Sequence, residues 1–579
     1  MKLIVDFIVS HPWNSSLLVV LLLVAGLADG VGISAMLPML SLAFDAGGEA
    51  TAGGDEEGLA GMIVRLVTAV GLTPSIGTLL SVIVIGIGVK SALIFVAEQR
   101  IGYLSADVAT RLRAQLLRAI TASSWQFYVS QSVGRLSNAM ATEAWRASNA
   151  YVYGVRMSVA FIETLVYFVL ALLVSWQATL ACLLAGAAVW RISHRFVAIS
   201  RQAGSGQTGW YRSLLGLLTD LLQSIKSLKA MGRERSAEAL VARETLALKG
   251  ELRREVLGNA GLDAAQEPLY TLVIVAGVYL ALVYFSVELA TVTFMTLVLA
   301  RLLKLGSKVQ KEYQRMTASE SAYWALLDTV AEAERHAEQT GGTLPPKFRD
   351  CIRLEHVGFG YGEARVLDDV SIEIRRGEIT CLVGGSGTGK STVADLVIGL
   401  IRPDTGRLLV DGVPLAQLDL TAWRRRIGYV PQDNLLLHDS VLMNVTLGDP
   451  AISESQVMAA LTAAGAAEFV AGLPEGLDTP VGERGARLSG GQRQRIMIAR
   501  ALAHEPWLLI LDEATSALDP ATEAAICSTL EALKGRVTIL TVTHQSAMRE
   551  LADRVYRVEA GRIAPEPAAP AAALSSGHS

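Results

Sequence analysis

The stretch that decides the fold of the second half of the chain is Gly384-Gly385-Ser386-Gly387-Thr388-Gly389-Lys390-Ser391-Thr392. Two glycines separated by four residues, then Lys and Ser, form the phosphate-loop pattern. An apolar run precedes it and apolar residues at helical spacing follow it, so the loop joins a buried strand to a helix. Backbone N–H groups of such a loop wrap the phosphates of a nucleoside triphosphate, while Lys390 reaches the β- and γ-phosphates and Ser391 ligates Mg²⁺.

Composition indicates that much of the chain lies in lipid. The 579 residues are 51% hydrophobic and only 18% charged, and the mean hydropathy is +0.39. The net charge of −4 argues against a nucleic-acid partner, for which a basic domain is expected. The four cysteines have no metal-like spacing, and we interpret them as small buried apolar residues.

Six apolar stretches are each long enough to cross a bilayer, which takes about 20 residues. The first begins near residue 14 and reaches Phe44 without a small-residue cleavage site, so we interpret it as a membrane span rather than a signal peptide. A membrane domain is therefore predicted over residues 1–335. The other five spans are expected at about residues 76–97, 151–174, 178–198, 267–287 and 289–305.

The charges of the connecting segments predict the orientation, because basic segments stay on the cytoplasmic side. The segment between the first two spans is acidic, whereas those after the second and fourth spans are rich in arginine and lysine. Both termini are therefore expected in the cytoplasm.

The two basic segments carry leucines at helical spacing, so the membrane helices are expected to continue into the cytoplasm. Each extension must turn back, near residues 124–134 and 222–232, and short exposed helices are expected there. From the residues alone, these helices are either solvated surfaces or docking sites for a cytosolic domain.

Four ionisable residues inside the predicted spans are candidate cargo contacts: Asp29, Glu163, Arg191 and Arg301. Each costs about 2.5–3.5 kcal/mol to insert, so such a residue normally faces a cavity or a partner. The alternatives are pairing between helices and, near a helix end, extension of the charged group to the membrane surface.

A linker over residues 336–349, rich in Gly and Pro, separates the membrane domain from the second domain. Alternating strand and helix patterns over residues 350–563 predict an α/β domain around a mainly parallel sheet. Within it, the apolar run Leu508–Leu511 ends in Asp512 and Glu513. Ligands of such sheets bind beyond the carboxyl ends of the strands, so we expect Asp512 to hold Mg²⁺ and Glu513 to act as general base.

Between these motifs lies Leu488-Ser489-Gly490-Gly491-Gln492, and here the sequence resembles the ATP-binding cassette (ABC) family. The pentapeptide matches the family's signature, and Val481–Gly485 resembles a motif of its exporters that contacts the cytoplasmic turns, which favours docking for the short helices. A six-span domain ahead of one cassette is also the exporter arrangement, so the resemblance covers nearly the whole chain. Further matching residues are Tyr361, Gln432, Asp519 and His544.

The resemblance implies a role for each of these residues. Tyr361 would stack on adenine, and Gln432 would sense both Mg²⁺ and the water. His544 would hold the γ-phosphate, which makes Gln432, Glu513 and His544 the catalytic set.

The resemblance also implies a composite site. Two cassettes bind head to tail around two ATP molecules, so Ser489 and Gly491, within the nucleotide-binding segment Ser489–Gln492, would contact the γ-phosphate held by the other subunit's Lys390. Asp519 would cross the interface. Because this chain carries both halves of the site, a homodimer is predicted.

Two segments stand apart from the pattern. The segment Leu435–Ser440 differs from the corresponding segment of exporters, which more often contains a Phe and a Gly. It lies at the expected contact with the cytoplasmic turns. The residues expected to carry hydrolysis are intact. Residues 564–579, rich in Pro and Ala, are predicted to be a disordered tail.

These features predict an ATP-driven exporter or flippase that works by alternating access in a bacterial inner membrane. We prefer an amphipathic cargo, a lipid or lipid-linked glycan, because the spans are apolar with few charges. Arg191 and Arg301 would meet an anionic head group, whereas Asp29 and Glu163 would equally meet a cation. A multidrug or small-peptide exporter is the alternative.

Other classes fit less well. An ATP-gated channel or regulatory subunit shares every motif, and the spans exclude a soluble cassette protein acting on ribosomes or DNA. Because the first span starts near residue 14, there is no room ahead of it for a peptidase domain, so a leader-cleaving peptide exporter is not expected.

Overall fold

The computed structural model describes residues 12–44, 59–69, 71, 73, 75–284, 289–339, 342–362, 364–433, 435–514 and 520–566. The chain forms two compact units: the first ends at Ala337, the second begins at Glu338, and Ser124–Gln126 group with the second.

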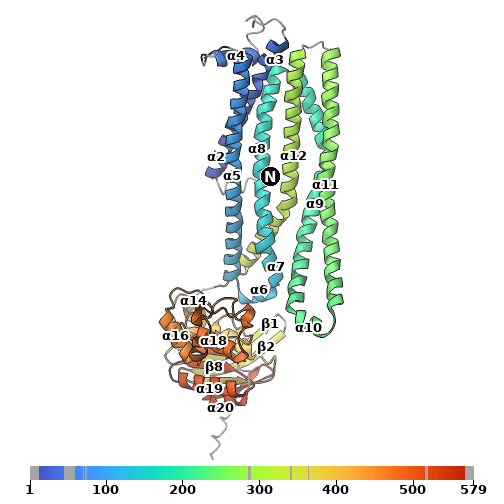
Figure 1. Cartoon of the computed structure of the whole chain (residues 1–579). Coiled ribbons are helices and arrows are strands. Elements are labelled where there is room, and N and C mark those ends of the chain that lie inside the picture. The colour runs from blue at the N-terminus through green and yellow to red at the C-terminus, as the bar shows by residue number, and fades with distance from the viewer. Residues whose placement is uncertain are drawn as a thin grey trace, which may run out of the picture. The chain divides into compact units, whose positions relative to one another are not determined.

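The first unit is helical (Figure 1). In its described part, six stretches are long and apolar enough to cross a membrane, which confirms the predicted number of spans. The first span combines α2 and α3 across a break at Ala35. The helices of the whole unit are α2 (Pro12–Ser34), α3 (Met36–Phe44), α4 (Leu59–Ala69), α5 (Ile76–Ala122), α6 (Trp125–Ser130), α7 (Val133–Asn138), the π-helical η1 (Ala139–Glu143), α8 (Ala144–Val174), α9 (Trp176–Gln223), α10 (Ile225–Ala230), α11 (Glu234–Val283) and α12 (Leu289–Arg335).

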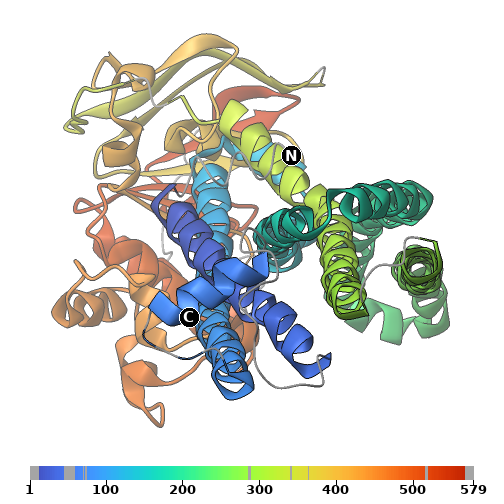
Figure 2. The same cartoon turned by 90° about the horizontal axis from the view of Figure 1, so that it is seen from above.

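The long helices far exceed the thickness of a membrane. α5, α9, α11 and α12 have 47 to 50 residues, or about 70 Å at 1.5 Å per residue, whereas the hydrocarbon core is about 30 Å thick. The excess forms the expected extensions, with α6 and α10 near their turns. α9 and α11 lie side by side (Figures 1 and 2), because Gly258 and Gly261 let α11 approach Ser200 and Phe196 of α9.

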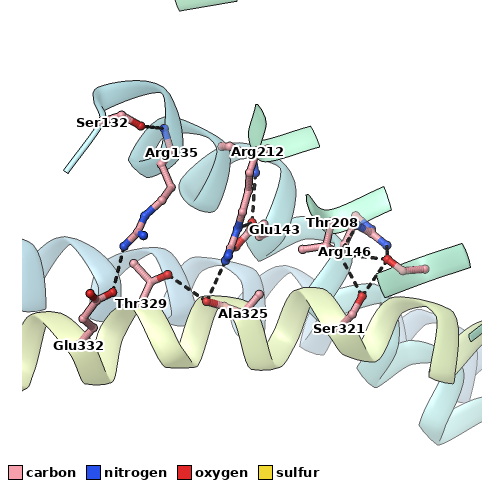
Figure 3. A network of polar contacts seen from close by, with 12 residues as sticks. Ser132, Arg135, Glu143, Arg146, Thr208, Arg212, Ser321, Ala325, Thr329 and Glu332 are labelled. Carbon is pink, nitrogen blue, oxygen red and sulfur yellow. Dashed lines mark hydrogen bonds and ion pairs between the residues drawn. The ribbon is translucent and has the colours of Figure 1, made fainter. Parts of the chain in front are cut away.

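Polar contacts join α8, α9 and α12 in these extensions (Figure 3). Glu143 is 1% exposed, and the Arg212 guanidinium donates to its carboxylate at 2.6 Å and to the Ala325 carbonyl at 3.1 Å. Arg146 donates to the Thr208 hydroxyl at 2.9 Å. Loss of Arg212 would leave the buried Glu143 carboxylate without its ion-pair partner, so these contacts hold the three helices together.

The second unit contains two sheets. The smaller has the order β2-β1-β4-β5 and is antiparallel. The larger has the order β10-β9-β3-β8-β7-β6; its strands are parallel except β10, which pairs antiparallel at one edge. Their bounds are β1 (Cys351–Tyr361), β2 (Ala364–Arg375), β3 (Ile379–Val383), β4 (Thr405–Val410), β5 (Val413–Pro414), β6 (Ile427–Val430), β7 (Leu508–Asp512), β8 (Thr538–Val542), β9 (Arg554–Glu559) and β10 (Arg562–Glu566).

Apolar side chains of the larger sheet alternate between two cores. Leu382 and Leu540 belong to one core, whereas Ile379, Leu511 and Ile539 belong to the other. Sheets of parallel strands are covered on both faces in this way. The helices of the unit are α13 (Lys390–Ile398), α14 (Leu420–Arg424), α15 (Val441–Thr446), α16 (Glu454–Ala463), α17 (Ala467–Ala471), α18 (Gly490–Leu502), α19 (Pro520–Leu533) and α20 (Ser546–Leu551), with 3₁₀ turns at Leu415–Gln417, Gly476–Asp478 and Glu483–Gly485.

The structure corrects the predicted start of the tail. Ala564, Pro565 and Glu566 belong to β10 rather than to a disordered segment, because they pair with β9. The Glu566 carboxylate also accepts hydrogen bonds from Arg549 and Arg557, each at 2.6 Å. The remaining predicted tail, residues 567–579, lies outside the described residues.

Gly204 tests the packing of α9 on α12. A Cβ there would lie 2.1 Å from the Ala318 carbonyl oxygen, whereas a Cβ at exposed Gly209 would meet nothing within 4 Å. We expect Gly204→Ala to lower the melting temperature in detergent, because overpacking costs about 1–3 kcal/mol. Gly209→Ala should leave it unchanged or raise it, since Ala is about 1 kcal/mol better than Gly in a helix. Equal effects of the two variants would contradict this packing.

Asp395 of α13 tests the pH dependence of stability. Burial, and then the nearby Asp512 carboxylate, raise the pKa of Asp395 from 3.8 to about 6. The folded state favours the neutral form of this carboxyl. The contribution of Asp395 to the free energy of unfolding is therefore full below pH 3.8 and is lost as the pH rises through about 6. Asp395→Asn should therefore raise the melting temperature of the nucleotide-free protein at pH 8, and raise it less at pH 5. A gain independent of pH would refute this assignment.

Candidate nucleotide and cargo sites

The phosphate loop follows β3 and leads into α13, as the sequence predicts. Gly389 has φ +104°, a left-handed conformation that favours glycine, and precedes the first helical residue, Lys390. A Cβ on Gly384 would lie 2.2 Å from the Val558 carbonyl oxygen. The loop therefore depends on glycine at both positions, because a side chain at Gly384 would collide with Val558 of β9 and one at Gly389 with Leu367 of β2.

Lys390 and Ser391 begin α13. Lys390 is 4% exposed, and its ammonium donates to the carbonyl oxygens of Gly384 and Gly385, at 2.9 and 2.6 Å. Burial lowers its pKa. The Ser391 hydroxyl donates to the carboxylate of Asp512, at the end of β7, at 3.1 Å. These two oxygens fit Mg²⁺, which takes one or two protein ligands and completes its shell with phosphates and water.

Glu513 lies at the centre of the described catalytic candidates. Its carboxylate accepts a hydrogen bond from the Gln432 amide at 2.8 Å and lies 3.3 Å from the His544 ring. The same His544 nitrogen is 3.2 Å from the Lys390 ammonium. Glu513 has φ +48°, an uncommon conformation for a residue other than glycine, and its N–H bonds to the Val542 carbonyl of β8 at 2.9 Å. The strained backbone points its carboxylate at this cluster.

The other predicted nucleotide-binding residues lie apart from this cluster. Tyr361 ends β1 and is 46% exposed, so its ring is available for stacking. The Ser489 hydroxyl caps α18 and forms a reciprocal pair with Gln492. Among the described hydrogen bonds and ion pairs, none joins Ser489–Gln492 to Lys390 or Glu513. Asp519 lies outside the described residues.

The atypical segment Leu435–Ser440 is held by Asn444, a residue that sequence analysis missed. Asn444 is fully buried; its side chain accepts from the Leu437 N–H at 2.8 Å and donates to the Leu437 and Ser440 carbonyls at 3.0 and 2.9 Å. The backbone of the segment is thus fixed, while the side chains of Leu435 and Leu437 are half exposed.

In the membrane unit, Asp29 of α2 is surrounded by hydrogen-bond donors. It is 2% exposed and bonds to Lys90 of α5, to the Tyr167 hydroxyl of α8 and, at 3.1 Å, to Arg301 of α12. The Arg301 guanidinium also lies over the Tyr167 ring, 5.6 Å from its centre. One buried carboxylate thus connects four helices.

A second carboxylate, Glu163 of α8, extends the same cluster. It is 4% exposed and lies 4.0 Å from Lys90 and 3.6 Å from Lys308 of α12. Arg191 is separate, because its side chain is exposed and forms none of the ion pairs seen among the described residues. We call Asp29, Lys90, Glu163, Tyr167, Arg301 and Lys308 the charge cluster.

Sequence analysis missed three members of the charge cluster. Lys90 lies in the second predicted span, so a complete inventory of ionisable residues in the spans would have found it. Lys308 falls just beyond the predicted end of the last span, and the role of Tyr167 depends on a contact 138 residues away in the sequence.

Comparisons with known proteins agree with this arrangement. Residues 367–516 match the ABC transporter family, and residues 16–302 match the ABC transporter transmembrane region. An ATP-dependent lipid A-core flippase of Chromobacterium violaceum is 31% identical over 489 residues, which cover 81% of each chain. The heterocyst differentiation ATP-binding protein HepA of Nostoc sp. is 28% identical and is matched over 79% of this chain and 76% of its own.

A solved structure shares the fold. It is a bacterial Atm1-family ABC exporter with ATP bound, with a TM-score of 0.77 at 23% identity, and the match covers 96% of this chain and 95% of that one. Six candidate spans and a nucleotide-binding unit are thus fused in one chain. The chain belongs to the ABC transporter family and is an exporter that binds and hydrolyses ATP to drive transport across a membrane.

Proposed function

We propose that two copies of this chain form a flippase that moves an amphipathic lipid with an anionic head group outward from the cytoplasmic leaflet of a bacterial inner membrane. The observation that carries the proposal is the charge cluster. Its three cations, Lys90, Arg301 and Lys308, outnumber its two carboxylates, so the cluster has a net positive charge.

The cations that reach the surface lie on α12. The side chains of Arg301 and Lys308 are 42% and 47% exposed, whereas the carboxylates they face are buried. A charge exposed to hydrocarbon is costly, so we infer that this face of α12 borders a polar pathway. An anionic head group there would meet two cations that remain partly free, and relatives named lipid A-core flippases support a lipid cargo.

A multidrug exporter for cationic compounds fits less well. Such a cargo needs an accessible carboxylate, but Asp29 and Glu163 are only 2% and 4% exposed. Each is already compensated by at least two cations of the charge cluster. A cation would have to displace these partners, and this would leave buried charges unpaired.

Hydrolysis is assigned to the cluster around Glu513. Ser391 and Asp512 would hold Mg²⁺, which supplies charge neutralisation for the phosphates, and Lys390 would bind the β- and γ-phosphates. The Glu513 carboxylate, positioned by Gln432 and His544, would accept the proton of the attacking water.

The homodimer is proposed because, among the described residues, no hydrogen bond or ion pair joins the signature segment to the phosphate loop of its own chain. Ser489 at the N-terminus of α18 would then complete the site on the partner subunit. The helices α6 and α10 would dock on the ATPase units in the cytoplasm.

Glu513→Gln tests both the general base and the dimer. Phosphate release should fall at least about 10²-fold, while ATP binding is retained because the variant removes no phosphate ligand. Unhydrolysed ATP should then raise the yield of cross-linked dimer over that of the unmodified protein. Glu531→Gln, at an exposed position on α19, is the control and should match the unmodified protein. Residual hydrolysis near the normal rate would rule out Glu513 as the base.

Arg301→Gln tests the cargo proposal in lipid nanodiscs. The concentration of anionic lipid that half-maximally stimulates ATP hydrolysis should rise about tenfold, equivalent to about 1.4 kcal/mol. Asp29 keeps Lys90 and Tyr167, so the fold should persist.

Arg191→Gln is the matched control, since that arginine lies outside the charge cluster. Equal shifts in the two variants, or stimulation by hydrophobic cations alone, would overturn the anionic assignment.

A further inference from the structure

A groove of about 760 Å³ lies between α9, α11 and α12. Its lining runs from Ser175 at the start of α9 to Ala185, and from Thr291 at the start of α12 to Leu303. It therefore occupies the half of the spans away from α10. The lining is almost wholly apolar, apart from Ser175, Gln177, Cys182, Thr291 and Thr296.

Small residues of both α9 and α11 line the groove. Ala178, Ala181 and Ala185 recur on α9, while Ala276, Gly277 and Ala281 recur on α11. Ala276 and Gly277 are exposed, and a Cβ on Gly277 would meet nothing within 4 Å. The two helices thus leave a gap that their own side chains do not fill.

The dimensions of the groove match one lipid leaflet. Thr291 to Leu303 is a rise of about 18 Å at 1.5 Å per residue, and half of the hydrocarbon core is about 15 Å thick. Ser175 and Gln177 lie at the start of α9 and Thr291 lies near the start of α12, which is the end of the groove away from α10, where a lipid's polar part would lie. Apolar side chains and Cys182 line the rest, apart from Thr296. The Thr296 hydroxyl is satisfied by the Val292 carbonyl at 2.7 Å.

We propose that this groove binds one acyl chain of a bilayer phospholipid. The apolar lining excludes water, and the surrounding solvent of a membrane span is hydrocarbon, so an acyl chain fills the gap at no cost of polar desolvation. The ester region then meets the hydroxyls and amide at the polar end.

The phospholipid site is distinct from the charge cluster. Met295, Leu299 and Leu303 of α12 recur every four residues and face the groove, whereas Arg301 points to Asp29 on α2. At 3.6 residues per turn, Arg301 and Leu303 lie about 200° apart around the helix. The groove lipid is therefore a structural ligand, and its binding does not depend on the proposed cargo.

The test is native mass spectrometry of the full-length protein purified with 1-palmitoyl-2-oleoyl-phosphatidylethanolamine. Gly277→Leu and Ala181→Leu place a branched side chain in the groove from either wall. Each should retain one phospholipid fewer per chain than the unmodified protein. The two variants act from different helices, and elution at the unmodified volume checks that each folds.

Two controls separate the outcomes. Ala188→Leu adds the same side chain at an exposed position of α9 outside the groove and should retain the full number of lipids. Arg301→Gln should also retain it, so failure of the cargo proposal leaves this one intact. Equal retention in all variants would overturn the proposal. A loss of dimer without a loss of lipid in Gly277→Leu would also overturn it, because a second copy of the chain would then cover the groove.

Discussion

The catalytic arrangement depends on the order of three parallel strands. β8 lies between β3 and β7, and parallel strands end at one edge, so the segments that follow them meet there. The phosphate loop follows β3, and His544 follows β8. Asp512 is the last residue of β7, and Glu513 comes directly after it. Neighbouring strands are about 4.8 Å apart, which is why side chains more than 120 residues apart in the sequence touch. No loop closure is needed to assemble this half of the site.

The membrane unit is governed by a different constraint, the cost of charge in lipid. Asp29 is compensated by Lys90 and Arg301, and it also accepts a hydrogen bond from Tyr167. Removing one partner from a buried pair is far more costly than exchanging both for apolar residues. The charge cluster therefore fixes how α2, α5, α8 and α12 meet. It also leaves an excess of positive charge on α12, where Arg301 and Lys308 are partly exposed.

Local patterns predicted the elements well, whereas contacts between distant residues escaped them. The glycine spacing around Lys390 and the six apolar stretches each depend on neighbouring residues, and the structure contains the corresponding loop and spans. The pairing of Glu163 with Lys308 joins residues far apart in the sequence. The periodicity of the sequence cannot predict a pairing between residues so far apart.

The same limit explains two smaller differences. The composition of residues 564–579 resembles a disordered tail, yet Ala564–Glu566 pair with β9 because the sheet edge offers free backbone groups. Asn444 looked like an ordinary polar residue, but it carries the hydrogen bonds that shape Leu435–Ser440. Both depend on a tertiary neighbour.

Transport itself is measured most directly in sealed proteoliposomes that contain the protein with its ATPase units outward. A fluorescent phospholipid with an anionic head group is placed in the outer leaflet, and its accessibility to a membrane-impermeant quencher is followed after addition of ATP and Mg²⁺. A flippase of this type moves the lipid to the inner leaflet, so the quenchable fraction should fall with ATP and stay constant with Glu513→Gln. A fraction unaffected by ATP, together with ATP-driven uptake of a hydrophobic cation, would contradict a lipid cargo.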